Sequence, residues 1–186
     1  MTDKNTIYFV LAVVLLFPLQ IKGDEMLLSA GDIEVEDGDT LRVTLGGEIK
    51  RVQLVGIDAP EDRENPKFMA DKKRTGLDFN TLLSLGIMAS DYLRKQLSRE
   101  ESFKLHYQPE RVDRYGRMPG ELMTQEGLSI NKQMVIDGYA IPTKSESTSG
   151  LQDYAGLQEQ SRQKRAGLWG LLPGPTRLWA DLPVAE

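Results

Sequence analysis

The chain has 186 residues, 27% of them charged and 40% hydrophobic, which is ordinary for one soluble globular domain with short extensions. It has no cysteine and one histidine, which excludes thiol catalysis, disulfide bonds, a zinc–thiolate site and a cage of histidine ligands. The net charge of −5 means that a site for nucleic acid must be a local basic patch on an acidic protein.

The first 23 residues differ in composition from the rest of the chain. An almost wholly apolar run from Ile7 to Leu19 follows Lys4 and precedes a polar segment. Its length matches the hydrophobic region of a signal peptide and is short of the roughly 20 residues that span a bilayer. We therefore expect residues 1–23 to be a signal peptide and the protein to be exported, with periplasmic, secreted and membrane-anchored destinations open. Because no Ala-x-Ala motif is present, an uncleaved anchor through residues 7–21 also stays open.

The segment from residue 31 to 57 has the pattern of three β-strands. Apolar and polar residues alternate between positions 33 and 45, and the pair Gly46-Gly47 favours a tight hairpin turn before a third strand at 49–57.

A long segment rich in charge follows these strands. We expect residues 62–84 to be a loop with at most one helical turn, because Pro66 and Gly76 interrupt it. A helix capped by Ser84 is predicted to run to about Leu97, with a broad apolar face.

The second half of the chain predicts two more strands and two more helices. The strands are expected at 102–107 and 117–124, a short helix is capped by Ser129, and a charged amphipathic helix covers 151–166. The Pro-rich tail from residue 173 onward is expected to be loose.

Together these elements predict an α+β protein, mainly β, built as a five-stranded OB-fold barrel with three flanking helices. That barrel is a common platform for oligonucleotides. We expect it to span residues 29–170, between the N-terminal segment and a flexible tail at 171–186.

Several short motifs carry a family resemblance. Alone, the acidic motifs at 37–40 and 58–61 are typical of turns and strand ends. In their order and spacing, however, the motifs resemble the thermonuclease (micrococcal or staphylococcal nuclease-like) family from about residue 31 to 169. They are Asp-Gly-Asp-Thr at 37–40, Val-Gly-Ile-Asp-Ala-Pro-Glu at 55–61, Asp-Arg-Tyr-Gly-Arg at 113–117, Asn131, Gly-Tyr-Ala at 138–140 and Gly-Leu-Trp at 167–169.

The resemblance implies a metal site and a catalytic carboxylate. Asp39 and Asp58 match the two calcium-binding carboxylates of the family, and the backbone carbonyl of Ala59 would complete the protein ligands. Such hard oxygen donors suit one Ca²⁺ ion, with another divalent metal left open. Glu61 matches the glutamate that orients or deprotonates the attacking water.

The resemblance also implies residues that bind the substrate. Arg117 matches an arginine that contacts the scissile phosphate and stabilises its charge in the transition state. Arg114 and Tyr115 match positions that contact the terminal phosphate and the nucleotide.

One position departs from the family pattern. Gln53 stands where the family has a second phosphate-binding arginine, and glutamine brings no charge. Arg51 lies on the same face of the strand, about 7 Å away at roughly 3.3 Å per residue. It could replace the missing arginine as a catalytic residue, form a salt bridge at the barrel rim, or be a solvated charge. The basic stretch 72–74 is equally open between a flap that docks nucleic acid and a solvated loop.

These observations predict a monomeric, calcium-dependent endonuclease of low sequence specificity that hydrolyses phosphodiester bonds of DNA, with RNA as a second candidate substrate. Two alternatives stay open because of Gln53 and the acidic composition. One is a catalytically weakened nucleic-acid-binding protein, and the other is an envelope protein of the same fold.

Overall fold

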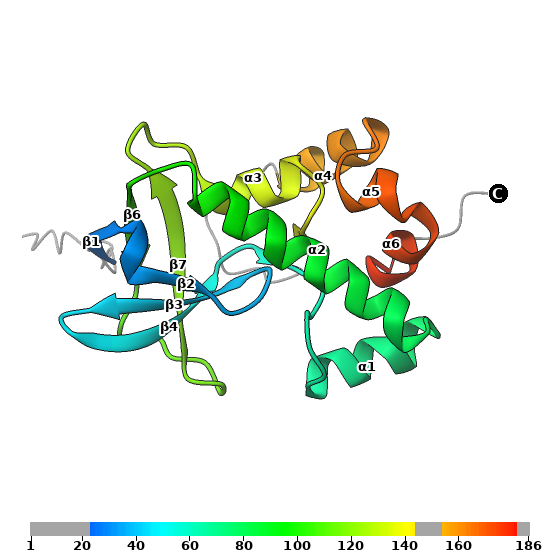
Figure 1. The fold of residues 1–186 in the computed structure, drawn as a ribbon, viewed down its shortest axis with the longest axis horizontal. Helices are drawn as coiled ribbons and strands as arrows, with labels where there is room; N and C mark the ends of the chain where they lie inside the picture. The colour runs from blue at the N-terminus through cyan, green and yellow to red at the C-terminus, as the bar shows by residue number, and fades with distance from the viewer. Residues whose placement is uncertain (1–22, 144–153, 182–186) are drawn as a thin grey trace, which may run out of the picture.

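A computed structural model describes residues 23–143 and 154–181 (Figure 1). Residues 1–22 of the predicted signal peptide and the first three residues of the helix predicted at 151–166 lie outside these ranges. None of the helices in the described ranges combines the length and the apolar character that crossing a membrane requires.

A six-stranded mixed sheet forms one end of the molecule, in the spatial order β1-β6-β7-β4-β3-β2. All neighbouring strands are antiparallel except β4 and β7, which are parallel. The strands are β1 (Asp24–Ser29), β2 (Ile33–Val35), β3 (Thr40–Leu45), β4 (Glu48–Leu54), β6 (Ser102–Tyr107) and β7 (Arg117–Thr124).

The α+β class is confirmed, but the predicted closed barrel requires a correction. Strand β1 was not predicted, and the strand pairing in the described residues runs from β1 to β2 without closing into a ring. A short 3₁₀ helix, η1 (Ala30–Asp32), joins these two outer strands, so the chain itself connects the ends of the sheet. If β1 and β2 are counted as one interrupted strand, the five predicted strands remain.

Alternating burial explains why these segments are strands. Along β7 every second residue is buried, so one face packs on the core and the other is partly exposed. The predicted hairpin between β3 and β4 is confirmed: Gly46 and Gly47 have φ of 58° and 85°, which β-carbon-bearing residues rarely adopt.

Six α-helices in the described ranges replace the three that were predicted. They are α1 (Pro66–Thr75), α2 (Phe79–Leu97), α3 (Ile130–Ile136), α4 (Tyr154–Gln163), α5 (Leu168–Leu171) and α6 (Pro173–Trp179). Ser129 caps α3 as predicted, by accepting a hydrogen bond from the backbone N–H of Lys132. Figure 1 shows α2 running from the sheet to the group of α1 and α6.

The predicted loop at 62–84 is wrong, since most of it is helical. Asn65 caps α1 by accepting a hydrogen bond from the N–H of Phe68, and Pro66 follows at the first helical position. The helix ends at Gly76, which is left-handed with φ of 68°. Helix α2 then begins six residues earlier than predicted, because Asp78 rather than Ser84 is its cap.

Two hydrophobic cores hold these elements together. In the first core, the C-terminal part of α2 and helix α3 pack against the buried side chains of the sheet. The second joins α1, the N-terminal part of α2, α5 and α6, and includes Phe68 and Trp179. Because Trp179 is only 2% exposed, the prediction of a loose tail is wrong for residues 173–179.

Candidate active site

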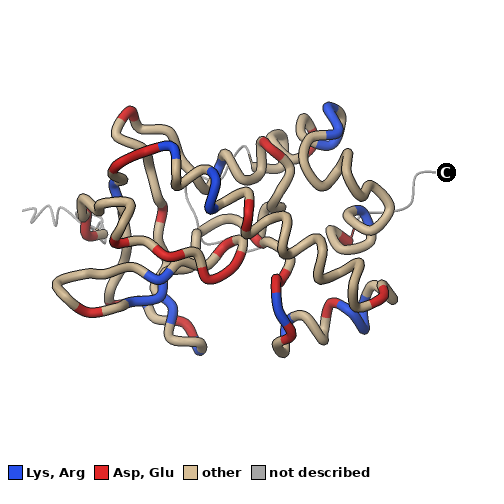
Figure 2. The backbone as a smooth tube through the Cα atoms, viewed as in Figure 1, with Lys and Arg blue, Asp and Glu red and all other residues tan. Residues whose placement is uncertain are grey.

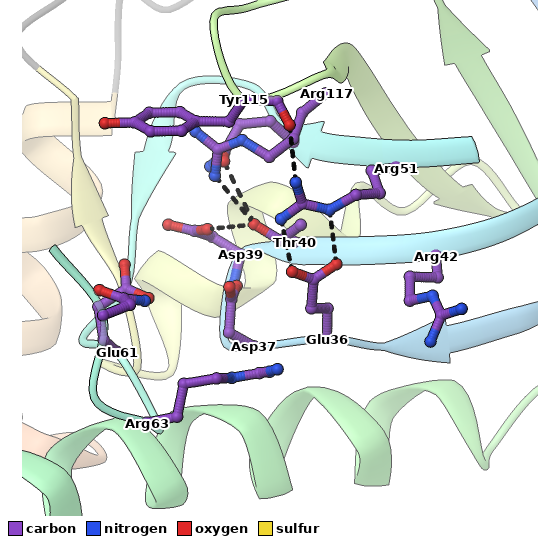
Figure 3. A network of polar contacts seen from close by, with 12 residues as sticks. Glu36, Asp37, Asp39, Thr40, Arg42, Arg51, Glu61, Arg63, Tyr115 and Arg117 are labelled. Atoms are coloured by element: carbon purple, nitrogen blue, oxygen red, sulfur yellow. Dashed lines mark hydrogen bonds and ion pairs between the residues drawn. The ribbon is translucent and has the colours of Figure 1, made fainter. Parts of the chain in front are cut away.

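Five segments converge where the strand ends meet the start of α1. They are the turn before β3, the end of the short strand β5 (Ile57–Asp58), the loop after it, the first turn of α1 and the start of β7. Figure 3 shows side chains of the first, third and last of these segments. Strand β5 is held by antiparallel pairing with β8 (Ile141–Pro142), which sets Asp58 opposite Ile141. The predicted motifs therefore meet in space at the edge of the sheet.

Gly38 allows the two acidic motifs to touch. A β-carbon at this position would lie 2.7 Å from the β-carbon of Ala59 and 2.9 Å from that of Ala89, closer than side chains tolerate. The resulting contact lets the Asp39 carboxylate accept a hydrogen bond of 2.8 Å from the backbone N–H of Ala59. The N–H of Asp39 donates in turn to Asp37 at 3.1 Å, so this part of the site is firmly positioned.

Lys67, in the first turn of α1, brings a cation to these acidic groups. Its ammonium Nζ lies 3.1 Å from Asp58 Oδ1, 3.1 Å from Glu61 Oε1 and 3.0 Å from the carbonyl oxygen of Ala59. In the sequence this lysine is one of many charges in the segment predicted to be a loop. The signal that could have found it was the Asn-Pro pair at 65–66, which starts a helix and aims its first turn at Glu61.

Burial and neighbouring negative charge raise the pKa of two carboxyl groups of the site, Asp37 and Asp58. Burial and the neighbouring charge of Asp39 raise the pKa of Asp37 to about 7. Burial raises the pKa of Asp58 to about 6, with Asp39 adding to the shift and Lys67 opposing it. Burial alone would lower the pKa of Lys67, but the charges of Asp58 and Glu61 raise it above its ordinary value. The cluster is thus short of positive charge.

Glu61 is 8% exposed and is held by neighbours on both oxygens. Oε2 accepts a hydrogen bond of 2.6 Å from the Asn65 side chain, and Oε1 contacts Lys67. Asn65 therefore caps α1 and orients the predicted catalytic carboxylate at the same time.

Arg117 reaches the site from the start of β7. Its Nε donates to Asp113 at 2.9 Å, and its Nη1 donates to the hydroxyl of Thr40 at 3.1 Å, next to Asp39. The guanidinium carbon also lies 5.2 Å from the centre of the Tyr115 ring. These contacts hold the guanidinium in a fixed orientation beside the acidic cluster (Figure 3).

The other predicted basic residues are arranged differently. Arg51 forms a two-point ion pair with Glu36, with Nε 2.8 Å from Oε2, and donates to the carbonyl of Tyr115 at 2.7 Å. These contacts favour the rim salt bridge among its three interpretations. Arg114 packs on the ring of Tyr115 at 4.7 Å and lines neither cleft of the site.

Two adjoining clefts, of about 360 and 300 Å³, share Glu61, Lys67 and Arg117. Gln53 lines the larger cleft, as does Arg111, which sequence reasoning did not single out. Figure 2 shows basic and acidic segments interleaved along the chain, both in the sheet and in the helices. The basic groups that face the larger cleft are therefore few: Lys67, Arg111 and Arg117.

The donor atoms of the site suit a hard cation. Asp39, Asp58 and the Ala59 carbonyl offer the oxygens that calcium prefers, and two of these groups already hold an ammonium. Across the described residues, no group of three or more acidic, histidine or cysteine side chains is arranged to hold a metal. A metal bound here would therefore depend on the backbone carbonyl and on water.

The open mixed sheet, the paired acidic turns and the fixed arginine fit a nuclease of the OB-fold type. The chain belongs to the family described as Staphylococcal nuclease homologue, whose model matches residues 51–170.

Curated relatives of the chain include two that are named as endonucleases. The chain is 30% identical over 142 residues to Endonuclease YhcR of Bacillus subtilis (strain 168), covering 73% of this chain and 11% of that protein. It is 28% identical over 148 residues to an Uncharacterized endonuclease of Escherichia coli O157:H7, covering 79% of this chain and 81% of that protein. Protein ParB of Escherichia coli is 28% identical over 145 residues, covering 74% of this chain and 70% of that protein. The chain thus spans about a tenth of the Bacillus relative and about four-fifths of the first Escherichia one.

Proposed function

We propose that this protein is a metal-dependent endonuclease that hydrolyses phosphodiester bonds of DNA, with RNA as a second substrate, at low sequence specificity. The observation that carries the proposal is the meeting of Glu61, Arg117 and the Asp39–Asp58 pair at one cleft. The family match and the relatives named as endonucleases support it.

In this proposal Arg117 binds the phosphate at the reacting centre. Its orientation is set in advance by Asp113 and Thr40, so no reorganisation is needed when negative charge develops on the phosphate. A positioned donor of this kind lowers a barrier by roughly 3–4 kcal/mol in comparable charge-stabilising sites.

Glu61 is proposed to accept the proton of the attacking water. The hydrogen bond from Asn65 keeps one of its oxygens fixed at the position where Glu61 lines both clefts. Asp39, Asp58 and the Ala59 carbonyl would hold one calcium ion or another divalent metal. That ion would supply Lewis acidity and a template for the phosphate oxygens.

Low sequence specificity follows from the groups that face the substrate. Phosphate contacts position a nucleic acid without reading its bases. Tyr115, which is 49% exposed and lines the smaller cleft, is proposed to contact the nucleotide through its ring without selecting a base.

The proposal includes the location and the state of the protein. The apolar run at 7–19 supports export, with residues 1–23 as a signal peptide or anchor and the nuclease domain acting as a monomer outside the cytoplasm. Cell fractionation and sedimentation of the purified chain test these two points. Recovery in the cytoplasm or as a stable oligomer would contradict them.

Gln53 favours a second candidate function, a nucleic-acid-binding protein with weakened catalysis. It lines the larger cleft as an uncharged side chain where the family has an arginine. Such a protein would bind DNA with a salt dependence set by the remaining cations and would cut slowly.

One experiment separates the two functions. The purified full chain is mixed with single- and double-stranded DNA, in calcium and then in a chelator. We expect calcium-dependent cleavage that is lost in Glu61→Gln and kept in the control Glu64→Gln, whose carboxylate is exposed. DNA that is bound but never cut, whichever divalent metal is added, would leave the second candidate.

A further inference from the structure

Lys67 contacts two of the three groups that are expected to bind the metal. We propose that its ammonium is a tethered cation that competes with a divalent metal for the oxygens of Asp58, Ala59 and Glu61. The inference rests on the proposed function only in taking Asp58 and Ala59 as metal ligands.

The distances place the ammonium inside the oxygen set. Nζ lies 3.0–3.1 Å from one oxygen each of Asp58, Ala59 and Glu61. Calcium binds oxygen at 2.3–2.6 Å and takes six to eight ligands. An ion that uses the Asp58 carboxylate and the Ala59 carbonyl at that range therefore needs the volume that the ammonium fills. The two cations exclude each other.

Helix α1 explains why the lysine is delivered there. Asn65 and Pro66 start the helix directly after the acidic motif, and Phe68, which is fully buried, fixes the first turn in the second core. The backbone of Lys67 is thereby held close to Glu61, while its side chain remains 38% exposed. The backbone of Lys67 is therefore fixed, while its side chain has room to move the ammonium.

Asp71 gives the displaced ammonium a second partner. Its carboxylate lies 3.6 Å from Nζ, one helical turn further along α1, and also pairs with Arg74 at 2.8 Å. Lys67 can turn toward Asp71 and leave the oxygen set without losing all ionic contact. Displacement by a metal is therefore open to this side chain.

The negative charge of the site allows a divalent ion to replace the Lys67 ammonium. Asp37, Asp39, Asp58 and Glu61 lie together at the site, and Lys67 is the ammonium that contacts two of them. A doubly charged ion neutralises such a cluster better than an ammonium does. Metal binding is thus weakened by the lysine and still possible.

Calorimetric titration of calcium into the full chain tests the inference. We expect Lys67→Met to bind calcium at least tenfold more tightly than the natural protein, which corresponds to about 1.4 kcal/mol. Lys73→Met is the matched control, because Lys73 is an exposed lysine of the same helix. An affinity of Lys67→Met equal to that of the natural chain would overturn the inference, since a purely structural lysine would change stability and not calcium affinity.

A second variant keeps the test decisive if Lys67→Met unfolds. Lys67→Gln removes the charge and keeps a hydrogen-bond donor, so it should show the same gain in affinity. Unfolding of both variants that saturating calcium reverses would also support the inference, because the ion then replaces the missing charge. Unfolding of both that calcium does not reverse would refute it. Cleavage is not measured, so an inactive natural chain would refute the proposed function and leave this result standing.

Discussion

The role of Arg51 is tested by changing each side of its ion pair. Arg51 is bound by both oxygens of Glu36 and by the Tyr115 carbonyl, which occupies its guanidinium with contacts within the protein. We predict that Arg51→Ala lowers stability and leaves cleavage nearly unchanged. Glu36→Gln, which keeps Arg51 and weakens the pair, should lower stability less.

The magnitude follows from the burial of the pair. An exposed pair contributes about 0.2–1 kcal/mol, and a hydrogen bond to a charged group about 1.5–3 kcal/mol. Because the side chains of Arg51 and Glu36 are 37% and 18% exposed, solvent screens part of the interaction. We expect a loss of about 2 kcal/mol for Arg51→Ala and about 1 kcal/mol for Glu36→Gln.

Urea denaturation and initial cleavage rates on double-stranded DNA measure the two effects. A structural role predicts less than a threefold change in rate, or about 0.65 kcal/mol, for both variants. If Arg51→Ala cut DNA more than about tenfold more slowly with unchanged stability, the reasoning from the ion pair would be refuted. Arg51 would then be the replacement phosphate ligand. Faster cleavage by Glu36→Gln would support that second outcome, because the substitution frees the guanidinium.

Three further predictions concern other parts of the chain. Gln53→Arg adds a cation to the cleft that Arg117 lines, so cleavage should rise about tenfold in steady-state assays. Gln53→Lys adds the charge without the bidentate geometry and separates the two effects. An unchanged rate would show that charge at this position is not limiting. Gly38→Ala forces a β-carbon against Ala59 and should cost about 1–3 kcal/mol in denaturation, partly recovered in Gly38→Ala/Ala59→Gly; full stability of the single variant contradicts the close approach. Trp179→Ala should cost about 3–5 kcal/mol, and Leu178→Ala, at a 44% exposed position, should cost far less; equal small losses would mean that α6 does not stabilise the domain.

The parts of the fold that could be predicted from sequence are those with strong local signals. Alternation of apolar and polar residues predicted β2, β3 and β6, and the Gly46-Gly47 pair predicted the hairpin. Strand β1 was missed because four of its six residues are exposed in a row, so it lacks the alternation of a half-buried strand. Its position depends on pairing with β6, which no local pattern encodes.

The helices between residues 62 and 84 were not predicted, although residues that cap helices are present there. Asn65 with Pro66, Gly76 and Asp78 supply a start, a stop and a second start in the segment predicted as a loop. Charge in this segment obscured the signal, since only Phe68 of α1 is buried and its apolar stripe is narrow. The C-terminal helix α6 was missed for a similar reason, because prolines are usually read as breakers although they favour first helical turns.

The site follows the same division between local and long-range information. The resemblance supplied Asp39, Asp58, Glu61 and Arg117, whose motifs can be recognised one by one, and the structure brings them to one cleft. Lys67 could not be found this way, because its role depends on the first turn of α1 bringing its side chain to Asp58 at the end of β5. A helix in the segment predicted to be a loop has thus placed a cation against the oxygens expected to bind the metal. Asn65, the cap of the same helix, holds Glu61 by a hydrogen bond. Glu61 should therefore keep its position when a metal ion replaces the ammonium. Substitutions in the first turn of α1 should consequently change the affinity for calcium more than they change the position of Glu61.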